Sequence, residues 1–89
     1  MQESKKVKEG KLVKIDADID KSFENVKVHG DFFIEPAGKL EEITRVIEGL
    51  ERDFDREKVV SQIEDIDAEL IGFSAEDVVD VLEKFNGEE

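Results

Sequence analysis

The chain has 89 residues, of which 13 are Lys or Arg and 25 are Asp or Glu, and its net charge is −12. This length is enough for one domain, because domains typically have about 50 to 250 residues, and we expect residues 1–89 to form a single one. Because the chain has no Cys, disulfide frameworks, thiolate zinc sites and Cys nucleophiles are excluded.

The charge and the hydropathy pattern also exclude two kinds of partner. Binding to a phosphate backbone needs clustered Lys and Arg, so a net charge of −12 argues against nucleic acid. No apolar run approaches the roughly 20 residues of a membrane span. The first residues, 1–6, lack the apolar core of a signal peptide. We therefore predict no membrane association and a cytoplasmic location.

Two β-strands are predicted in the first part of the chain. In the first strand, charged residues alternate with residues on one face, namely Val13, Ile15, Ala17 and Ile19. Residues 20–25 are polar and turn-prone. The alternation then resumes on one face with Val26, Val28, Gly30, Phe32 and Ile34. Two such runs form an antiparallel hairpin, and residues 5–8 either extend the first strand or pair with a partner chain.

Everything beyond Pro36 is predicted to be helical. Proline donates no ladder hydrogen bond and therefore stops the second strand. The first helix covers about residues 39–50, because apolar residues recur there at three- and four-residue spacing, namely Leu40, Ile43, Ile47 and Leu50.

Two more helices follow. The second begins at Asp55 as N-cap and ends before Gly72, with a buried stripe of Val59, Ile63 and Ile66. The third begins at Ser74, with Asp77 placed for a capping box, and ends at residues 86–87. Its buried stripe is Val78, Leu82 and Phe85.

The predicted order β-β-α-α-α is that of an α+β domain, in which three amphipathic helices cover one face of a small antiparallel sheet. A two-stranded sheet is weak by itself, and a domain of this size hides only about 60% of its unfolded surface. Both points favour completion by a partner chain.

No active site is predicted from the sequence. Residues 16–20 have the acidic spacing that opens a calcium loop, but Lys21 and Lys27 stand where that loop needs Gly and Glu. His29 has no second metal ligand and no nucleophile near it. The Gly residues form neither a phosphate loop nor a dinucleotide fingerprint. We expect no metal or cofactor to be bound by this chain alone.

Phe32 and Phe33 stand out because adjacent residues on a strand point to opposite faces. Only one of the two aromatic side chains can then enter the core. Alternatively, a bulge at Gly30 shifts the parity and leaves both partly buried.

A contact patch follows from one choice of strand register. If Val26 pairs with Ile19, Leu12 lies opposite Phe33, and Ile15 lies opposite Gly30. The apolar pair then stands amid the charged residues of the uncovered face, namely Lys27, His29 and Asp31. This patch is the predicted site of contact with a partner.

Several segments along the chain carry a family resemblance: Gly10–Ile19, Val26–Phe33 followed by Pro36, Leu40–Ile43, Asp55–Glu57 and Gly72–Asp77. Together they resemble the accessory (C-terminal) domain of lipoate-protein ligases over about residues 5–85, and the Gly-Asp-Phe-Phe strand is the most specific piece. In most bacterial ligases this domain is fused behind the catalytic domain. In some archaea it is a separate small subunit, and a free chain of 89 residues is most similar to that Thermoplasma-type arrangement.

The resemblance implies an accessory, non-catalytic subunit of lipoate-protein ligase. It implies a heterodimer with the catalytic large subunit, which activates lipoate with ATP and Mg²⁺ to lipoyl-AMP; the acceptor domains of lipoylation are then indirect partners. The family's Arg-rich, Gly-Gly-Gly and catalytic Lys signature is absent here, so no catalytic residue is carried over. The expected interface residues are Leu12, His29, Gly30, Asp31, Phe32 and Phe33.

A different class of function fits the composition as well. A stand-alone acidic module, such as an inhibitor or an antitoxin-like protein, would mask a basic surface by charge complementarity.

Overall fold

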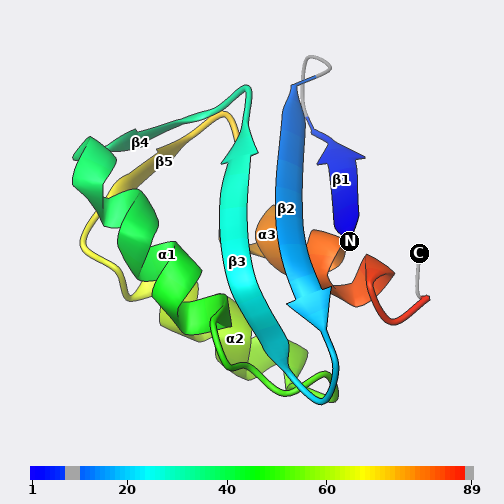
Figure 1. The fold of residues 1–89 in the computed structure, drawn as a ribbon. Coiled ribbons are helices and arrows are strands. Elements are labelled where there is room, and N and C mark those ends of the chain that lie inside the picture. Colours follow the sequence, from blue (N-terminus) through cyan, green and yellow to red (C-terminus); the bar gives the residue numbers. More distant parts are fainter. Residues whose placement is uncertain (8–10, 88–89) are drawn as a thin grey trace.

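The computed structural model describes residues 1–7 and 11–87 and has an α+β fold (Figure 1). Its elements are β1 (Gln2–Lys6), β2 (Leu12–Ile19), β3 (Phe23–Gly30), β4 (Phe33–Glu35), the 3-10 turn η2 (Ala37–Lys39), α1 (Leu40–Ile47), α2 (Arg56–Glu64), β5 (Glu69–Ile71) and α3 (Ala75–Lys84). The strands form a three-stranded sheet in the order β1-β2-β3 and a separate pair, β4-β5. The fold class is as predicted, but the sheet has a third strand, and the pattern predicts neither β5 nor the break between β3 and β4.

The additional strand of the sheet is β1. It folds back on β2 in antiparallel orientation, with Glu3 opposite Ile15 and Lys5 opposite Val13. The predicted extension of β2 into residues 5–8 is therefore wrong for the first two of these residues, which belong to a separate strand. Residue 8, which ends that predicted extension, and residue 10, which begins the first resembling segment, lie outside the described part of the chain.

The β2-β3 hairpin has a shorter connection than predicted. Phe23 lies in the segment predicted as a turn, yet it opens β3 opposite Ile19, where the pattern places Val26. Its side chain is fully buried, and its ring meets that of Phe85 edge-on with 5.6 Å between centroids. Burying such a side chain contributes about 1.5–3 kcal/mol, which explains why residues 20–25 do not all form a turn.

A bulge restores the predicted faces of β3. Asp18 pairs with Glu24 whereas Asp16 pairs with Lys27, so β3 has one residue more than β2 in this interval. Asn25 lies in the bulge with a φ of 53°, a left-handed conformation that Asn tolerates better than most residues. The residues predicted to point inward therefore stay buried, namely Val26 and Val28.

The chain turns sharply where β3 ends, at Gly30. Its φ is +153°, and a Cβ atom there would lie 2.0 Å from the carbonyl oxygen of Leu12. The Asp31 N–H donates a hydrogen bond of 2.9 Å to the same oxygen. The predicted continuous second strand is therefore wrong: β4 leaves the sheet and pairs with β5 above α1 (Figure 1).

The predicted starts of the second and third helices are confirmed. The Asp55 side chain accepts hydrogen bonds from the N–H groups of Glu57 at 3.1 Å and Lys58 at 3.4 Å. Ser74 and Asp77 form a capping box at the start of α3. Both caps satisfy backbone donors that the first turn of a helix leaves free.

The first and third helices end two or three residues earlier than predicted, whereas α2 ends before Gly72, as predicted. α1 ends at Ile47, and Gly49 follows with a φ of +80°, a conformation that favours glycine after a helix. α2 ends at Glu64, so Ile66 packs against the core from beyond the helix. α3 ends at Lys84.

α3 lies behind the three-stranded sheet in Figure 1, whereas α1 lies beside β3. α3 packs against β1 and β2, α1 packs beside β3, and α2 packs against both α1 and α3. The fully buried side chains between the layers include Val13, Ile15, Phe23, Ile43, Ile47, Ile63, Val78, Val79, Val81 and Leu82. The other face of the sheet is charged, and no described helix covers it.

Candidate functional site

The six residues of the predicted interface cluster around the corner where β3 ends. Leu12 begins β2, His29 and Gly30 end β3, and the next three residues lead into β4. His29 is exposed and lies across the sheet from Lys14. Asp31 is also exposed.

Gly30 gives this corner its shape. Its lack of a Cβ lets the strand approach the Leu12 carbonyl, which accepts the hydrogen bond of the Asp31 N–H. A non-glycine residue would be strained twice, by the clash with backbone and by the positive φ. The corner is therefore held by backbone geometry.

The two aromatic residues beyond the corner have different environments. Phe32 is half-buried and stacks on Phe73, with 4.2 Å between centroids and 35° between ring planes. Phe33 is 67% exposed. The prediction that only one aromatic enters the core is thus confirmed. The predicted pairing of Phe33 with Leu12 is wrong, because the break at Gly30 moves Phe33 out of the sheet and places it opposite Ile71.

The pair of strands β4-β5 presents a surface that the sequence reasoning missed. Ile34 is buried and Leu70 is half-buried, so these two side chains hold the pair on the core. The alternate residues point away from the core and form what we call the ribbon face: Phe33, Glu35, Glu69 and Ile71. The alternation of polar and apolar residues over 69–73 is typical of a strand. A run as short as β5 becomes a strand only because it pairs with β4.

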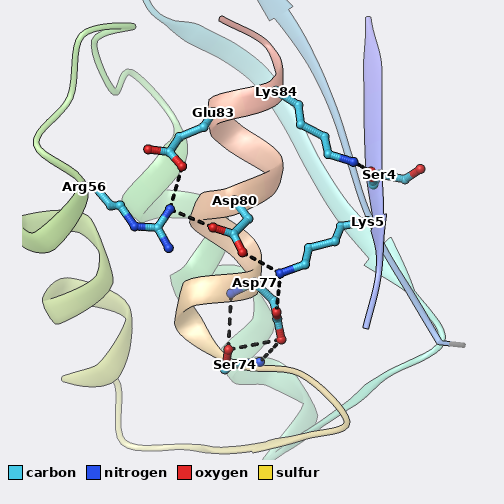
Figure 2. Close-up of polar contacts among 8 residues, drawn as sticks. All are labelled: Ser4, Lys5, Arg56, Ser74, Asp77, Asp80, Glu83 and Lys84. Carbon is cyan, nitrogen blue, oxygen red and sulfur yellow. Dashed lines mark hydrogen bonds and ion pairs between the residues drawn. The ribbon is translucent and has the colours of Figure 1, made fainter. Parts of the chain in front are cut away.

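A second cluster of polar residues joins α3 to β1 and α2 (Figure 2). The Lys5 Nζ lies 2.9 Å from Asp77 Oδ1 and also contacts the Asp80 carboxylate. The Arg56 Nη1 lies 2.7 Å from Asp80 Oδ1 and 2.6 Å from Glu83 Oε1. Because every charge in the cluster has an opposite partner, we interpret it as structural.

The pKa values of this cluster follow from its contacts. Hydrogen bonds to Asp80 and then Asp77 raise the pKa of Lys5 above its usual value. Partial burial acts to raise the pKa of the two carboxyls, but their hydrogen bonds together outweigh it: those from Lys5 and Ser74 at Asp77, and those from Lys5 and Arg56 at Asp80. The pKa of each carboxyl is therefore lowered, which means that the folded state favours the charged pairs.

A groove of about 560 Å³ lies beside this cluster, lined by Lys5, Lys6, Val7, Gly72, Phe73, Ser74 and Asp77. Two acceptor groups line this groove at the start of α3, the Ser74 hydroxyl and the Asp77 carboxylate, and both already accept hydrogen bonds in the capping box. Within residues 1–7 and 11–87, no three His, Asp or Glu side chains converge on a point that a metal ion would occupy. In the same ranges, none of the helices has the length and apolar character that crossing a bilayer requires.

Comparison with known proteins gives information on the fold. A solved structure matches with a TM-score of 0.72 and 22% sequence identity over 92% of each chain. It comes from the archaeal lipoylation system of Thermoplasma acidophilum, with a bipartite lipoate protein ligase and its E2 lipoyl domain. The present chain has the fold of a component of that lipoylation system. No family model matches the chain, and no curated protein matches its sequence.

Proposed function

We propose that this chain is the accessory, non-catalytic subunit of a two-subunit lipoate protein ligase and forms a heterodimer with the catalytic chain. The observation that carries the proposal is the fold shared over 92% of both chains with a component of a lipoylation system that has a bipartite ligase. The segments that resemble the ligase accessory domain support the same assignment from the sequence.

In this role the chain assists the activation of lipoate. A carboxylate oxygen of lipoate attacks the α-phosphorus of ATP, the bond to the β-phosphate oxygen breaks, and pyrophosphate leaves. The amine of an acceptor lysine then attacks the carbonyl carbon of lipoyl-AMP, loses a proton and displaces AMP. The catalytic signature of the ligase family is absent from this sequence, so we assign ATP, Mg²⁺ and lipoate to the catalytic chain.

The contribution of the accessory chain is positional. Its corner at Gly30 and the exposed Phe33 pack beside the cleft of the catalytic chain and hold the adenylate-binding loops in the arrangement that activation needs. A contact of this kind also excludes water from the reactive adenylate, as a lid does. The contact must later open, because the acceptor lysine needs access to lipoyl-AMP.

The test is lipoate-dependent ATP–pyrophosphate exchange by the catalytic chain, measured with and without this chain. We expect exchange to need both chains. Transfer from preformed lipoyl-AMP to an acceptor domain serves as the control, because it omits activation and should proceed with the catalytic chain alone. Equal exchange rates with and without this chain contradict the proposal.

A stand-alone acidic binding module is the second candidate. It is favoured by the net charge of −12 and by the concentration of Asp and Glu after Gly30. Affinity purification of the tagged chain from its source cells separates the two functions. Recovery of a ligase chain that lacks its own accessory domain supports the subunit, and recovery of a basic toxin-like protein contradicts it.

A further inference from the structure

The ribbon face combines two cross-strand pairs of opposite character. Phe33 lies directly opposite Ile71, and Glu35 lies directly opposite Glu69. The first pair is apolar yet exposed, at 67% for Phe33 and 37% for Ile71. The second pair places two carboxylates on adjacent strands. A small apolar spot and a doubly acidic spot therefore lie side by side on one surface.

The acidic pair does not stabilise the isolated chain. Like charges directly opposite each other on paired strands are destabilising, by a few tenths of a kcal/mol to about 1 kcal/mol. Among the described residues, the ion pairs use other carboxylates, namely those of Glu42, Asp77, Asp80 and Glu83. The carboxylates of Glu35 and Glu69 are thus available to a cation from outside the described chain.

The ribbon face is held in place from beneath. Ile34 is 7% exposed and Leu70 packs against the core from the same side of the pair. Phe32 precedes β4 and Phe73 follows β5, and the stacking of their rings joins the two strands at one end. A surface that is already ordered loses little conformational entropy on binding.

The edges of the sheet are less suitable for a partner. At β1, the Lys84 Nζ donates a hydrogen bond of 2.7 Å to the Ser4 carbonyl oxygen. At β3, the Glu48 carboxylate accepts hydrogen bonds of 3.0 Å from the N–H groups of Asn25 and Val26. Groups that a partner strand would pair with are therefore already used within the chain.

We infer that the ribbon face is the docking surface for a basic segment of the catalytic ligase chain, one that places an apolar side chain against Phe33 and Ile71 and a Lys or Arg between Glu35 and Glu69. This inference rests on the proposed function and adds to it the chemistry of the contact. The aromatic ring supplies the buried anchor. The two carboxylates select a cationic partner and accelerate its association.

Two variants test this surface by binding to the purified catalytic chain at low and high salt. Phe33→Ser removes the anchor, and because Phe33 is exposed the variant should fold as the wild type does; we expect about a tenfold or greater loss of affinity. Glu35→Gln combined with Glu69→Gln removes both carboxylates. We expect slower association and a several-fold weaker complex at low salt, with the difference from wild type vanishing at high salt.

The double variant separates docking from a structural role. Removing the two like charges that face each other should leave the thermal midpoint of unfolding unchanged or raised while the affinity falls. A structural role of the two carboxylates would lower both the midpoint and the affinity. The matched control is Glu51→Gln combined with Glu57→Gln, which removes the same charge from exposed positions outside the ribbon face and should bind like the wild type.

Each outcome decides one question. If the wild type binds and both ribbon variants bind equally well, the docking surface is wrong while the proposed function stands. If the wild type itself does not bind the catalytic chain, the proposed function fails, and the docking surface fails with it. If sedimentation shows that the chain alone self-associates and that Phe33→Ser abolishes this, the ribbon face serves a second copy and the inference is overturned.

Discussion

Gly30 lies so close to Leu12 that a Cβ atom on Gly30 would be 2.0 Å from the Leu12 carbonyl oxygen. The atom in the way belongs to the backbone and cannot rotate aside. Together with the φ of +153°, this contact makes the corner between β3 and β4 specific for glycine.

We therefore expect Gly30→Ala to lower the free energy of unfolding by about 3 kcal/mol, from backbone strain and displacement of β2. Urea denaturation measures the effect. The matched control is Gly38→Ala, because nothing lies within 4 Å of the added Cβ there, and this variant should be unchanged or slightly more stable. Equal stability of the two variants would show that the corner can relax.

Phe32 and Phe33 should respond differently to truncation. Phe32→Ala removes the stacking on Phe73 and part of the core contact, so we expect a loss of about 1–3 kcal/mol of unfolding free energy. Phe33→Ala removes an exposed ring and should change it by no more than about 0.5 kcal/mol. Thermal or urea unfolding of the two variants, side by side, checks this.

Ile15→Ala provides the reference for a substitution that acts on folding. Ile15 is fully buried in the sheet, and the cavity left by Ala should cost about 2–5 kcal/mol. In an assay of complex formation, Ile15→Ala should weaken the complex only as far as it unfolds the chain. A loss of binding by a folded Ile15→Ala chain, seen by circular dichroism, would point to an interface elsewhere than the exposed Phe33.

Asp77 and Asp80 should make stability depend on pH at the acid end. The pKa of each carboxyl is lowered in the folded state. Their contribution to the free energy of unfolding is therefore fully present above the unfolded pKa of about 4. It is lost as the pH falls through the lower folded pKa. Urea unfolding at neutral and acidic pH should show the decrease.

The variant Asp80→Asn isolates this contribution. It removes one carboxylate from Lys5 and Arg56, while Asp77 and Glu83 remain to pair with them, so we expect a loss of about 1 kcal/mol at neutral pH. On acidification, the free energy of unfolding of Asp80→Asn should decrease by less than that of the wild type. The same acid decrease in both proteins would assign the pH dependence to other carboxyls.

Glu48 should matter for the bulge in β3. Its carboxylate accepts the N–H groups of Asn25 and Val26, so Glu48→Ala leaves both donors without this acceptor and should cost about 1 kcal/mol. Glu51→Ala, at a nearby exposed position, should change stability by less than about 0.5 kcal/mol. Hydrogen exchange at Asn25 and Val26 should be faster in Glu48→Ala only; unchanged exchange there would mean that water replaces the carboxylate at no cost.

Features that depend on neighbouring residues were predictable from the sequence. The N-caps at Asp55 and Ser74 are local hydrogen bonds, and their side-chain types and spacing identify them. The face of β2 that carries Val13 and Ile15 follows from alternation alone. These elements need no knowledge of the rest of the chain.

Features that depend on contacts far along the chain were not predictable. Phe23 looks like part of a polar turn until Phe54 and Phe85 surround it. The ribbon face exists only because Phe33 meets Ile71, which is distant in sequence. The sequence therefore predicts correctly that Phe33 is the exposed aromatic residue, but it places Phe33 opposite Leu12 and not opposite Ile71.

The measurement that tests the central claim most directly is lipoate-dependent exchange of labelled pyrophosphate into ATP. The purified catalytic chain is assayed alone, with this chain, and with an unrelated acidic protein of similar size. We predict exchange that rises with this chain and saturates near one equivalent, and no rise with the unrelated protein. Exchange by the catalytic chain alone at the rate of the mixture would contradict the account.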